Sequence, residues 1–329
     1  MRLIRLSSSA PRRRAPAGPI ITVLAIMATA AASSSPMYAQ AGGPLALLVP
    51  VSARAASLGN AWVAGRDEYT IFSNPALITP TTGFGLTLAS HGSDGRSIAS
   101  ASAATVGEYT FGWGVHLLDF STSRSNTAYP YAPAALVGSG DADLFSMVAV
   151  VAVRRTYKGF GIGVAAKYAQ DVVPRETAQN GLLVVPTRGA ALLGDVGISH
   201  SLLGGTAGLS VQNISQPYSV GPNSFSVPTQ IAVGWSDQTQ WGPLDIGYVT
   251  QVTARREGWV APGGGVEVGW AWIDGYSVTG RVGARRTETD DEKPVGIGAS
   301  FRADRLNIEY GVNFYTGNEA SHRLTLRWR

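Results

Sequence analysis

The 329-residue sequence predicts an all-β fold, a transmembrane outer-membrane β-barrel of about 14 antiparallel strands with a small N-terminal plug. Three observations lead to this prediction: an export leader, a long series of segments that alternate between polar and apolar residues, and connections that alternate between short and long. The chain has no Cys, which excludes a disulfide framework and a zinc site built on cysteine.

Residues 1–40 have the features of a signal peptide. An apolar stretch from Pro19 to Ala32 separates small residues near position 40 from five leading arginines, Arg2, Arg5, Arg12, Arg13 and Arg14. An uncleaved anchor helix is the alternative, but the stretch is shorter than the roughly 20 apolar residues of a spanning helix. We expect cleavage after Ala39 or Ala41, and export of the product.

The charge balance depends on this leader. The chain has 26 Lys and Arg against 22 Asp and Glu, and the leader removes five arginines without removing an acid. The mature chain is therefore close to neutral, and a basic surface for nucleic acid is not supported.

Segments with a two-residue period follow residue 80. In "LNIEYGVNFY" (306–315), Leu306 and Ile308 point one way, and Asn307 and Glu309 point the other. A soluble sandwich would bury the apolar face, whereas a membrane barrel turns that face toward lipid. We count 14 such segments, at 82–91, 96–106, 108–119, 142–154, 158–170, 188–200, 204–213, 227–236, 241–253, 261–272, 274–286, 293–302, 304–316 and 320–329.

The connections distinguish between the sandwich and the barrel. Tight turns such as "WIDG" and "RADR" follow every second segment, whereas most of the others are long, as at 121–143, 171–189 and 214–228. Short turns at one rim and long loops at the other are typical of barrels with periplasmic termini. We therefore expect Leu306 to face lipid, with the protein in the outer membrane of a Gram-negative-type bacterium.

The inward faces of these segments carry charges of both signs. Unpaired charges in a narrow lumen cost several kcal/mol, so we expect a lattice of pairs that braces a closed lumen. Its members would be Asp195, Asp245, Glu267, Arg281, Arg285, Arg302 and Glu309, with Arg323 and Arg327 of the last strand. The segment "LFSMVAVVAV" (144–153) is apolar on both faces, which alternation alone does not explain.

Two of the long loops carry apolar residues where polar ones are usual. Such patches on a rim mark contacts with protein, lipid or a hydrophobic ligand. The candidate contact residues are Tyr129, Tyr131, Leu182, Leu183 and Val184. The alternative is that these loops pack on one another as a lid.

Residues 41–80 do not fit the strand series. They combine small residues, a helix-compatible stretch from Ala53 to Val63 and an Asn-Pro break at Asn74 and Pro75. We expect this segment to plug the periplasmic mouth of a barrel formed by residues 81–329, because a wide lumen needs filling.

The stretch "SARAASLGNAWVAGRDEYTIFSNPALI" (52–78) resembles the N-terminal signature of the PorV/PorQ family, within the wider FadL-like group of outer-membrane barrels. That signature reads G-A-R-A-x-x-M-G-G-A-F-V-A, then one or two acids, then N-P-A-G-L. The plug-motif residues here are Arg54, Gly59, Asn74, Pro75 and Ala76. The sequence departs from the signature at Ser52, Leu58 and Asn60, and it lacks the Gly before Leu77.

The resemblance implies two roles. PorV-like barrels act in type IX secretion, with a translocon and the C-terminal domains of exported cargo as partners. FadL-like barrels take up long-chain fatty acids and other hydrophobic small molecules. A lattice of paired charges favours the partner-binding secretion component, and the hydrophobic channel is the alternative.

An enzymatic role has little support. The four histidines are scattered, and none has metal-ligand spacing with another His. "GGG" (263–265) and "GFGIG" (159–163) lie in alternating segments without the helix that follows a phosphate loop. We expect neither a cofactor nor a metal, and no catalytic residue.

Overall fold

The computed structural model describes residues 44–80, 83–92, 95–121, 143–173, 187–220, 223–225, 227–256, 258–287, 292–316 and 319–328. The leader and the candidate loop contacts Tyr129, Tyr131, Leu182, Leu183 and Val184 lie outside these ranges. None of the helices in the described ranges is long and apolar enough to cross a membrane.

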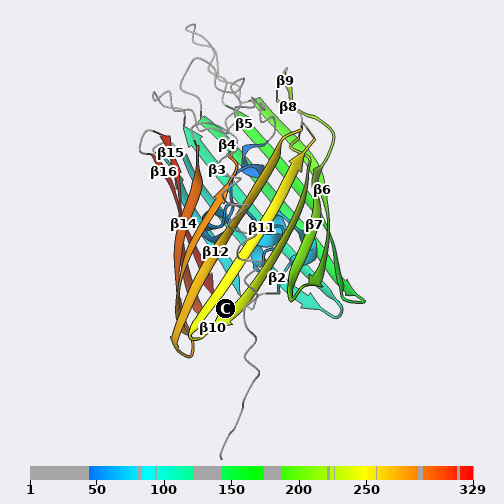
Figure 1. The fold of residues 1–329 in the computed structure, drawn as a ribbon. Coiled ribbons are helices and arrows are strands. Elements are labelled where there is room, and N and C mark those ends of the chain that lie inside the picture. The colour runs from blue at the N-terminus through cyan, green and yellow to red at the C-terminus, as the bar shows by residue number, and fades with distance from the viewer. Residues whose placement is uncertain are drawn as a thin grey trace, which may run out of the picture.

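Fourteen antiparallel strands close into one barrel, in which the first strand pairs with the last (Figure 1). They are β1 (Phe84–His91), β2 (Gly95–Val106), β3 (Tyr109–Ser121), β4 (Asp143–Tyr157), β5 (Phe160–Val173), β6 (Thr187–Leu202), β7 (Gly205–Ile214), β10 (Gln230–Trp241), β11 (Leu244–Arg255), β12 (Val260–Ile273), β13 (Tyr276–Arg285), β14 (Glu292–Ala303), β15 (Leu306–Tyr315) and β16 (Ala320–Trp328). All 14 predicted segments are confirmed as barrel strands.

The two remaining strands form a separate hairpin. β8 (Tyr218–Val220) pairs with β9 (Asn223–Phe225), and the barrel continues directly from β7 to β10. The sequence predicts only a loop at 214–228, because strands of three residues are too short to show the two-residue alternation of polar and apolar side chains.

Two-residue turns join the strands at one end of the barrel, here named the tight-turn rim (lower end in Figure 1). Lys158 and Gly159 have φ of 48° and 84°, and Leu203 and Gly204 have φ of 53° and 86°. Two consecutive left-handed residues form the turn type that matches the right-handed twist of paired strands. The opposite end is the long-loop rim.

Side chains alternate between the two faces of the wall as predicted. In β15, Tyr310 is 45% exposed on the outside, whereas Glu309 is fully buried inside. In β16, Arg323 and Arg327 are buried in the lumen. The outer face is therefore apolar, and the inner face carries the charges.

The segment from Pro44 to Pro80 lies inside the barrel and is here named the plug (blue in Figure 1). It contains η1 (Leu45–Leu47), α2 (Ala53–Ser57), η2 (Glu68–Phe72) and η3 (Pro75–Leu77). Ser52 caps α2 by accepting a hydrogen bond from the Ala55 amide. Short helices of small residues suit a crowded lumen.

The plug explains why β4 is apolar on both faces. Val148 is buried in one cluster with Ala46 of η1, and Val150 in another with Tyr69 and Ile71 of η2. The inner face of β4 is thus a core that faces the plug, while the outer face carries exposed residues such as Val151.

Candidate functional site

A chain of ion pairs joins the plug to the barrel wall near the tight-turn rim. Arg327 of β16 pairs with Asp67 beside η2, with Glu68 of η2 at 2.8 Å and with Glu309 of β15 at 3.1 Å. All four side chains are almost completely buried. One wall arginine therefore meets three carboxylates, two of them from the plug.

The chain continues through Glu267 of β12. Its carboxylate accepts hydrogen bonds from Arg54 of α2 at 2.5 Å and from Arg281 of β13 at 3.0 Å. Arg281 also lies 3.5 Å from Glu309, which links the two groups. Three arginines and four carboxylates thus share one network.

Burial affects the plug members of this network differently. Burial raises the pKa of the Glu68 carboxyl, and the attraction of Arg327 only partly opposes it. Burial acts to lower the pKa of Arg54, but the carboxylates of Glu267, Glu309 and Asp67 together outweigh it and keep that pKa above its ordinary value. In Glu68, burial therefore favours the protonated carboxyl.

The remaining predicted lumen charges differ in their contacts. Asp195 pairs with Lys167 of β5 at 2.6 Å, and Arg285 pairs with Glu292. Asp245 and Arg302 form no ion pair within the described part of the chain, and Arg302 is exposed near the tight-turn rim. Of the nine residues that the alternation suggested, six thus form ion pairs, whereas Asp245, Arg302 and Arg323 form none within the described residues.

The plug-motif residues position the plug. The Asn74 side chain donates to Val63 O at 2.8 Å and accepts from Ala76 N at 3.0 Å, which holds two turns of the plug together. Pro75 lies against Gly163 of β5, where an added Cβ would be 2.3 Å from the Pro75 carbonyl carbon. The Asn-Pro-Ala element is therefore a joint inside the plug that rests on a glycine-lined wall.

Gly59 shows the same close approach. It has a φ of +67°, and a Cβ there would be 2.3 Å from Ala284 O of β13. A residue with a side chain would have to move either the plug or the wall at this point.

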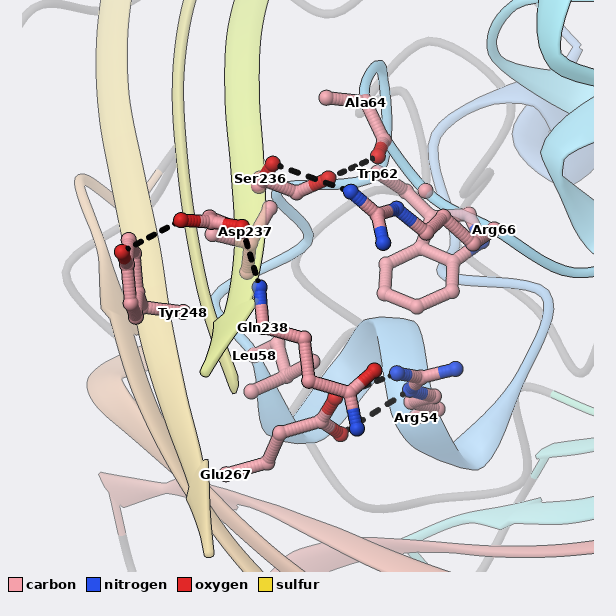
Figure 2. A pocket seen from close by; sticks show the side chains of 12 residues that line it. Arg54, Leu58, Trp62, Ala64, Arg66, Ser236, Asp237, Gln238, Tyr248 and Glu267 are labelled. Carbon is pink, nitrogen blue, oxygen red and sulfur yellow. Dashed lines mark hydrogen bonds and ion pairs between the residues drawn. The ribbon is translucent and has the colours of Figure 1, made fainter. Parts of the chain in front are cut away.

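Two cavities lie beside the plug. The rim pocket has a volume of about 30 Å³ and lies near the tight-turn rim (Figure 2). The plug lines one part of it, and β10, β11 and β12 line the other. Tyr248 donates to Asp237 at 2.8 Å on one side of it, and Arg54 meets Glu267 on another. Ion pairs and hydrogen bonds occupy most of its polar groups.

The inner cavity lies toward the long-loop rim and has a volume of about 80 Å³. Most of its plug residues are apolar, apart from Ser52, Asn60 and Ser73, and most of its wall residues are polar, apart from Val148. The lining includes Leu47, Leu48, Val49, Val51 and Phe72 from the plug and Lys167, Gln212, Asn213, Gln230 and Gln251 from the wall. Trp62 is the one residue common to the described linings of both cavities.

A β-bulge lies in the wall beside the inner cavity. The pairing of β6 with β7 shifts between Gly194 and Val196, and Asn213 has a φ of 57°. Asp195 accepts from the Asn213 amide at 2.8 Å, and Lys167 donates to Asn213 Oδ1 at 3.2 Å and to Phe72 O at 3.0 Å. Lys167 therefore ties the bulge to the plug.

The sequence reading did not single out Trp62, Lys167 or Asp67 as site residues. Trp62 is the one tryptophan among small residues in the plug stretch, which was an available signal. Lys167 pairs with Asp195 of the neighbouring strand and reaches Phe72 of the plug, and Asp67 pairs with Arg327 of the last strand. The sequence alone does not show that the plug meets these strands. No group of His, Cys, Asp and Glu with metal-binding geometry occurs among the described residues.

A scan against protein-family models gives no match, and a search of curated proteins gives no relative. Solved structures are similar in fold. The toluene transporter TbuX of Ralstonia pickettii has a TM-score of 0.55 at 12% identity, covering 89% of this chain and 100% of that one. The toluene transporter TodX of Pseudomonas putida has a TM-score of 0.54 at 9% identity, covering 84% and 96%.

A FadL homologue of Pseudomonas aeruginosa is also similar, with a TM-score of 0.53 at 10% identity, covering 87% of this chain and 98% of that one. These likenesses agree with the expected FadL-like barrel. They give no support to the narrower resemblance to PorV and PorQ.

Proposed function

We propose that this protein is an outer-membrane channel for hydrophobic small molecules, the alternative role that the sequence suggested. The observation that carries the proposal is a plugged barrel of 14 strands with an inner cavity, in a fold similar to that of two toluene transporters and a FadL homologue. The outer-membrane location, with lipid around the barrel, belongs to the same proposal. It is supported by the apolar outer face, where Phe111, Trp113 and Ile162 are about half exposed.

The inner cavity supports a mainly apolar ligand. Its plug side is mostly aliphatic and aromatic, with Ser52, Asn60 and Ser73 among these groups, while Lys167 on the wall already has three partners in Asp195, Asn213 and Phe72. An engineered cavity that binds benzene has about 150 Å³, so the 80 Å³ here requires side chains to move when a ligand of that size enters.

The secretion role is less well supported. It rests on the plug motif and on the lattice of paired charges. Both hold the plug together and seat it on the wall, through Asn74, Gly59 and Arg327, which both roles require. They therefore do not distinguish a secretion component from a channel, whereas the similar structures are two toluene transporters and a FadL homologue.

The test is direct binding of toluene and of a long-chain fatty acid to the full chain purified in detergent, measured by calorimetry. Val148→Gln introduces a polar group into the inner cavity, whereas Val151→Gln changes the outer face of the same strand. A buried polar group without a partner costs about 1–3 kcal/mol, so Val148→Gln should weaken binding roughly tenfold to hundredfold.

Val151→Gln should bind as the parent does. Absence of binding of either compound to the parent, together with co-purification of a large translocon or of exported cargo, would contradict the channel and favour secretion.

A further inference from the structure

We propose that the side chain of Trp62 is the barrier between the inner cavity and the rim pocket, and that rotation of its ring joins the two while the rest of the plug stays on the wall. This inference rests on the proposed function, because it assigns a route through the lumen. Its starting point is that Trp62 belongs to both linings and is only 5% exposed.

The polar contacts of the indole ring come from the plug itself, whereas its apolar packing also includes Val249 of β11. Its Nε1 donates to Asp67 Oδ1 at 2.9 Å, and Gly65 lies so close that an added Cβ would be 2.7 Å from the ring. The guanidinium of Arg54 lies 5.1 Å from the ring centroid, on the side of the rim pocket (Figure 2). One hydrogen bond, one cation–π contact and apolar packing against Leu58 and Val249 therefore hold the ring in place.

The plug backbone is fastened to the wall much more firmly. Around Trp62, Val63 N donates to Gln251, and Ala64 O accepts from Ser236. Farther along, Ala53 N donates to Thr325, and Arg323 donates to Pro50 O. The ion pairs of Arg327 with Asp67 and Glu68 add to these bonds.

Moving the plug as a body would break all of these bonds together. Rotating the Trp62 ring breaks only its own contacts and leaves the pairs between Asp67 and Arg327 and between Arg54 and Glu267 intact. The side-chain motion is therefore the smaller change that connects the cavities. It also requires Asp67 to keep its place, since Asp67 binds both Trp62 and Arg327.

The absence of cysteine from the sequence permits a clean test. Val51→Cys places a single thiol in the lining of the inner cavity, away from the contacts of Trp62. The full chain carrying this thiol is purified in detergent, and its reaction rate with a small charged thiol reagent is measured. The same measurement is repeated after Trp62→Ala, Trp62→Leu and Trp62→Phe.

We expect Trp62→Ala to raise the reaction rate several-fold, Trp62→Leu to raise it less, and Trp62→Phe to leave it near the parent value. Trp259→Ala is the matched control. Trp259 is also buried, at 6% exposure, and lies 4.6 Å from the Arg255 guanidinium, but it belongs to neither lining. Its replacement should leave the rate unchanged.

Equal rates in the parent and in both Trp62→Ala and Trp62→Leu would overturn the proposal, whether those rates are slow or fast. An equal increase in Trp259→Ala would also overturn it, because the effect would then be general loosening. Heat-modifiable migration in gels verifies that each variant forms a barrel, and Trp62→Leu provides the decision if Trp62→Ala does not fold. The assay uses no hydrophobic ligand, so its outcome is separate from that of the binding test.

Discussion

Arg327 in the last strand and Asp67 in the plug form a buried ion pair across 260 positions of sequence. The same guanidinium also reaches Glu68 and Glu309. A single arginine of the wall therefore pairs with both plug carboxylates, Asp67 and Glu68. Its removal would leave these two carboxylates buried without that cation.

Arg327→Leu should strongly destabilise the plugged barrel. Removing one partner of a buried pair costs about 3–5 kcal/mol, because the other charge remains buried and uncompensated. The midpoint of unfolding in denaturant, followed by loss of heat-modifiable migration, measures the effect.

Arg155→Leu is the matched control for that substitution. Arg155 pairs with Glu108 at 2.5 Å, but both side chains are exposed, at 48% and 71%. Exposed pairs contribute about 0–1 kcal/mol. Similar shifts of the unfolding midpoint in Arg327→Leu and Arg155→Leu would contradict this prediction, because burial would then not determine how much an ion pair contributes to stability.

Gly283→Ala should displace the plug. A Cβ at this position of β13 would lie 2.4 Å from Gly59 N and from the Leu58 carbonyl carbon, so a backbone has to move. Overpacking of this kind costs about 1–3 kcal/mol. Gly280→Ala in the same strand is the control, because its Cβ would meet nothing within 4 Å. Limited proteolysis of the plug should accelerate in Gly283→Ala alone, and equal protection in both variants would contradict the contact.

Glu68→Gln should change the dependence of stability on pH. Burial raises the pKa of Glu68 in the folded protein above its unfolded value, so the folded state binds more protons there than the unfolded state does. This residue therefore contributes stability below the unfolded pKa, near pH 4.3, and that contribution is lost as the pH rises through the folded pKa.

The measured quantity is the difference in unfolding midpoint between parent and variant across pH 4 to 8. We expect Glu68→Gln to gain stability relative to the parent as the pH rises. Glu108→Gln, at an exposed position, is the control for the general effect of removing a carboxylate. A flat difference for Glu68→Gln would mean that Arg327 fully compensates the buried carboxylate.

The strands were predictable because alternation is a local property. Ten residues of sequence suffice to establish that Glu309 and Tyr310 point to opposite faces of the wall, and the order of short and long connections indicates which face is the lumen. The inner face of β4 was not predictable in this way. Val148 and Val150 are apolar because Ala46, Tyr69 and Ile71 of the plug pack on them, and alternation within β4 carries no information about a distant partner.

The candidate site shows the same division. The sequence identified Glu267, Arg281 and Glu309 as lumen residues, and these three side chains meet. Trp62 was overlooked because its role depends on two cavities that exist only after the plug enters the barrel. Asp245 and Arg302 lie at positions of the inner face, as expected, but form no ion pair in the described residues. Alternation predicts which face a side chain is on, but not whether an opposite charge lies near it.

The pairing of Asp67 with Arg327 also orders events during biogenesis. Synthesis runs from the N-terminus, so the plug is made before any strand, whereas its principal cation arrives with β16, which also closes the barrel against β1. The plug can bind β10, β11 and β12 earlier, through Ser236, Gln251 and Glu267, but its two carboxylates acquire Arg327 only when β16 is in place. The last fastening of the plug therefore coincides with completion of the wall.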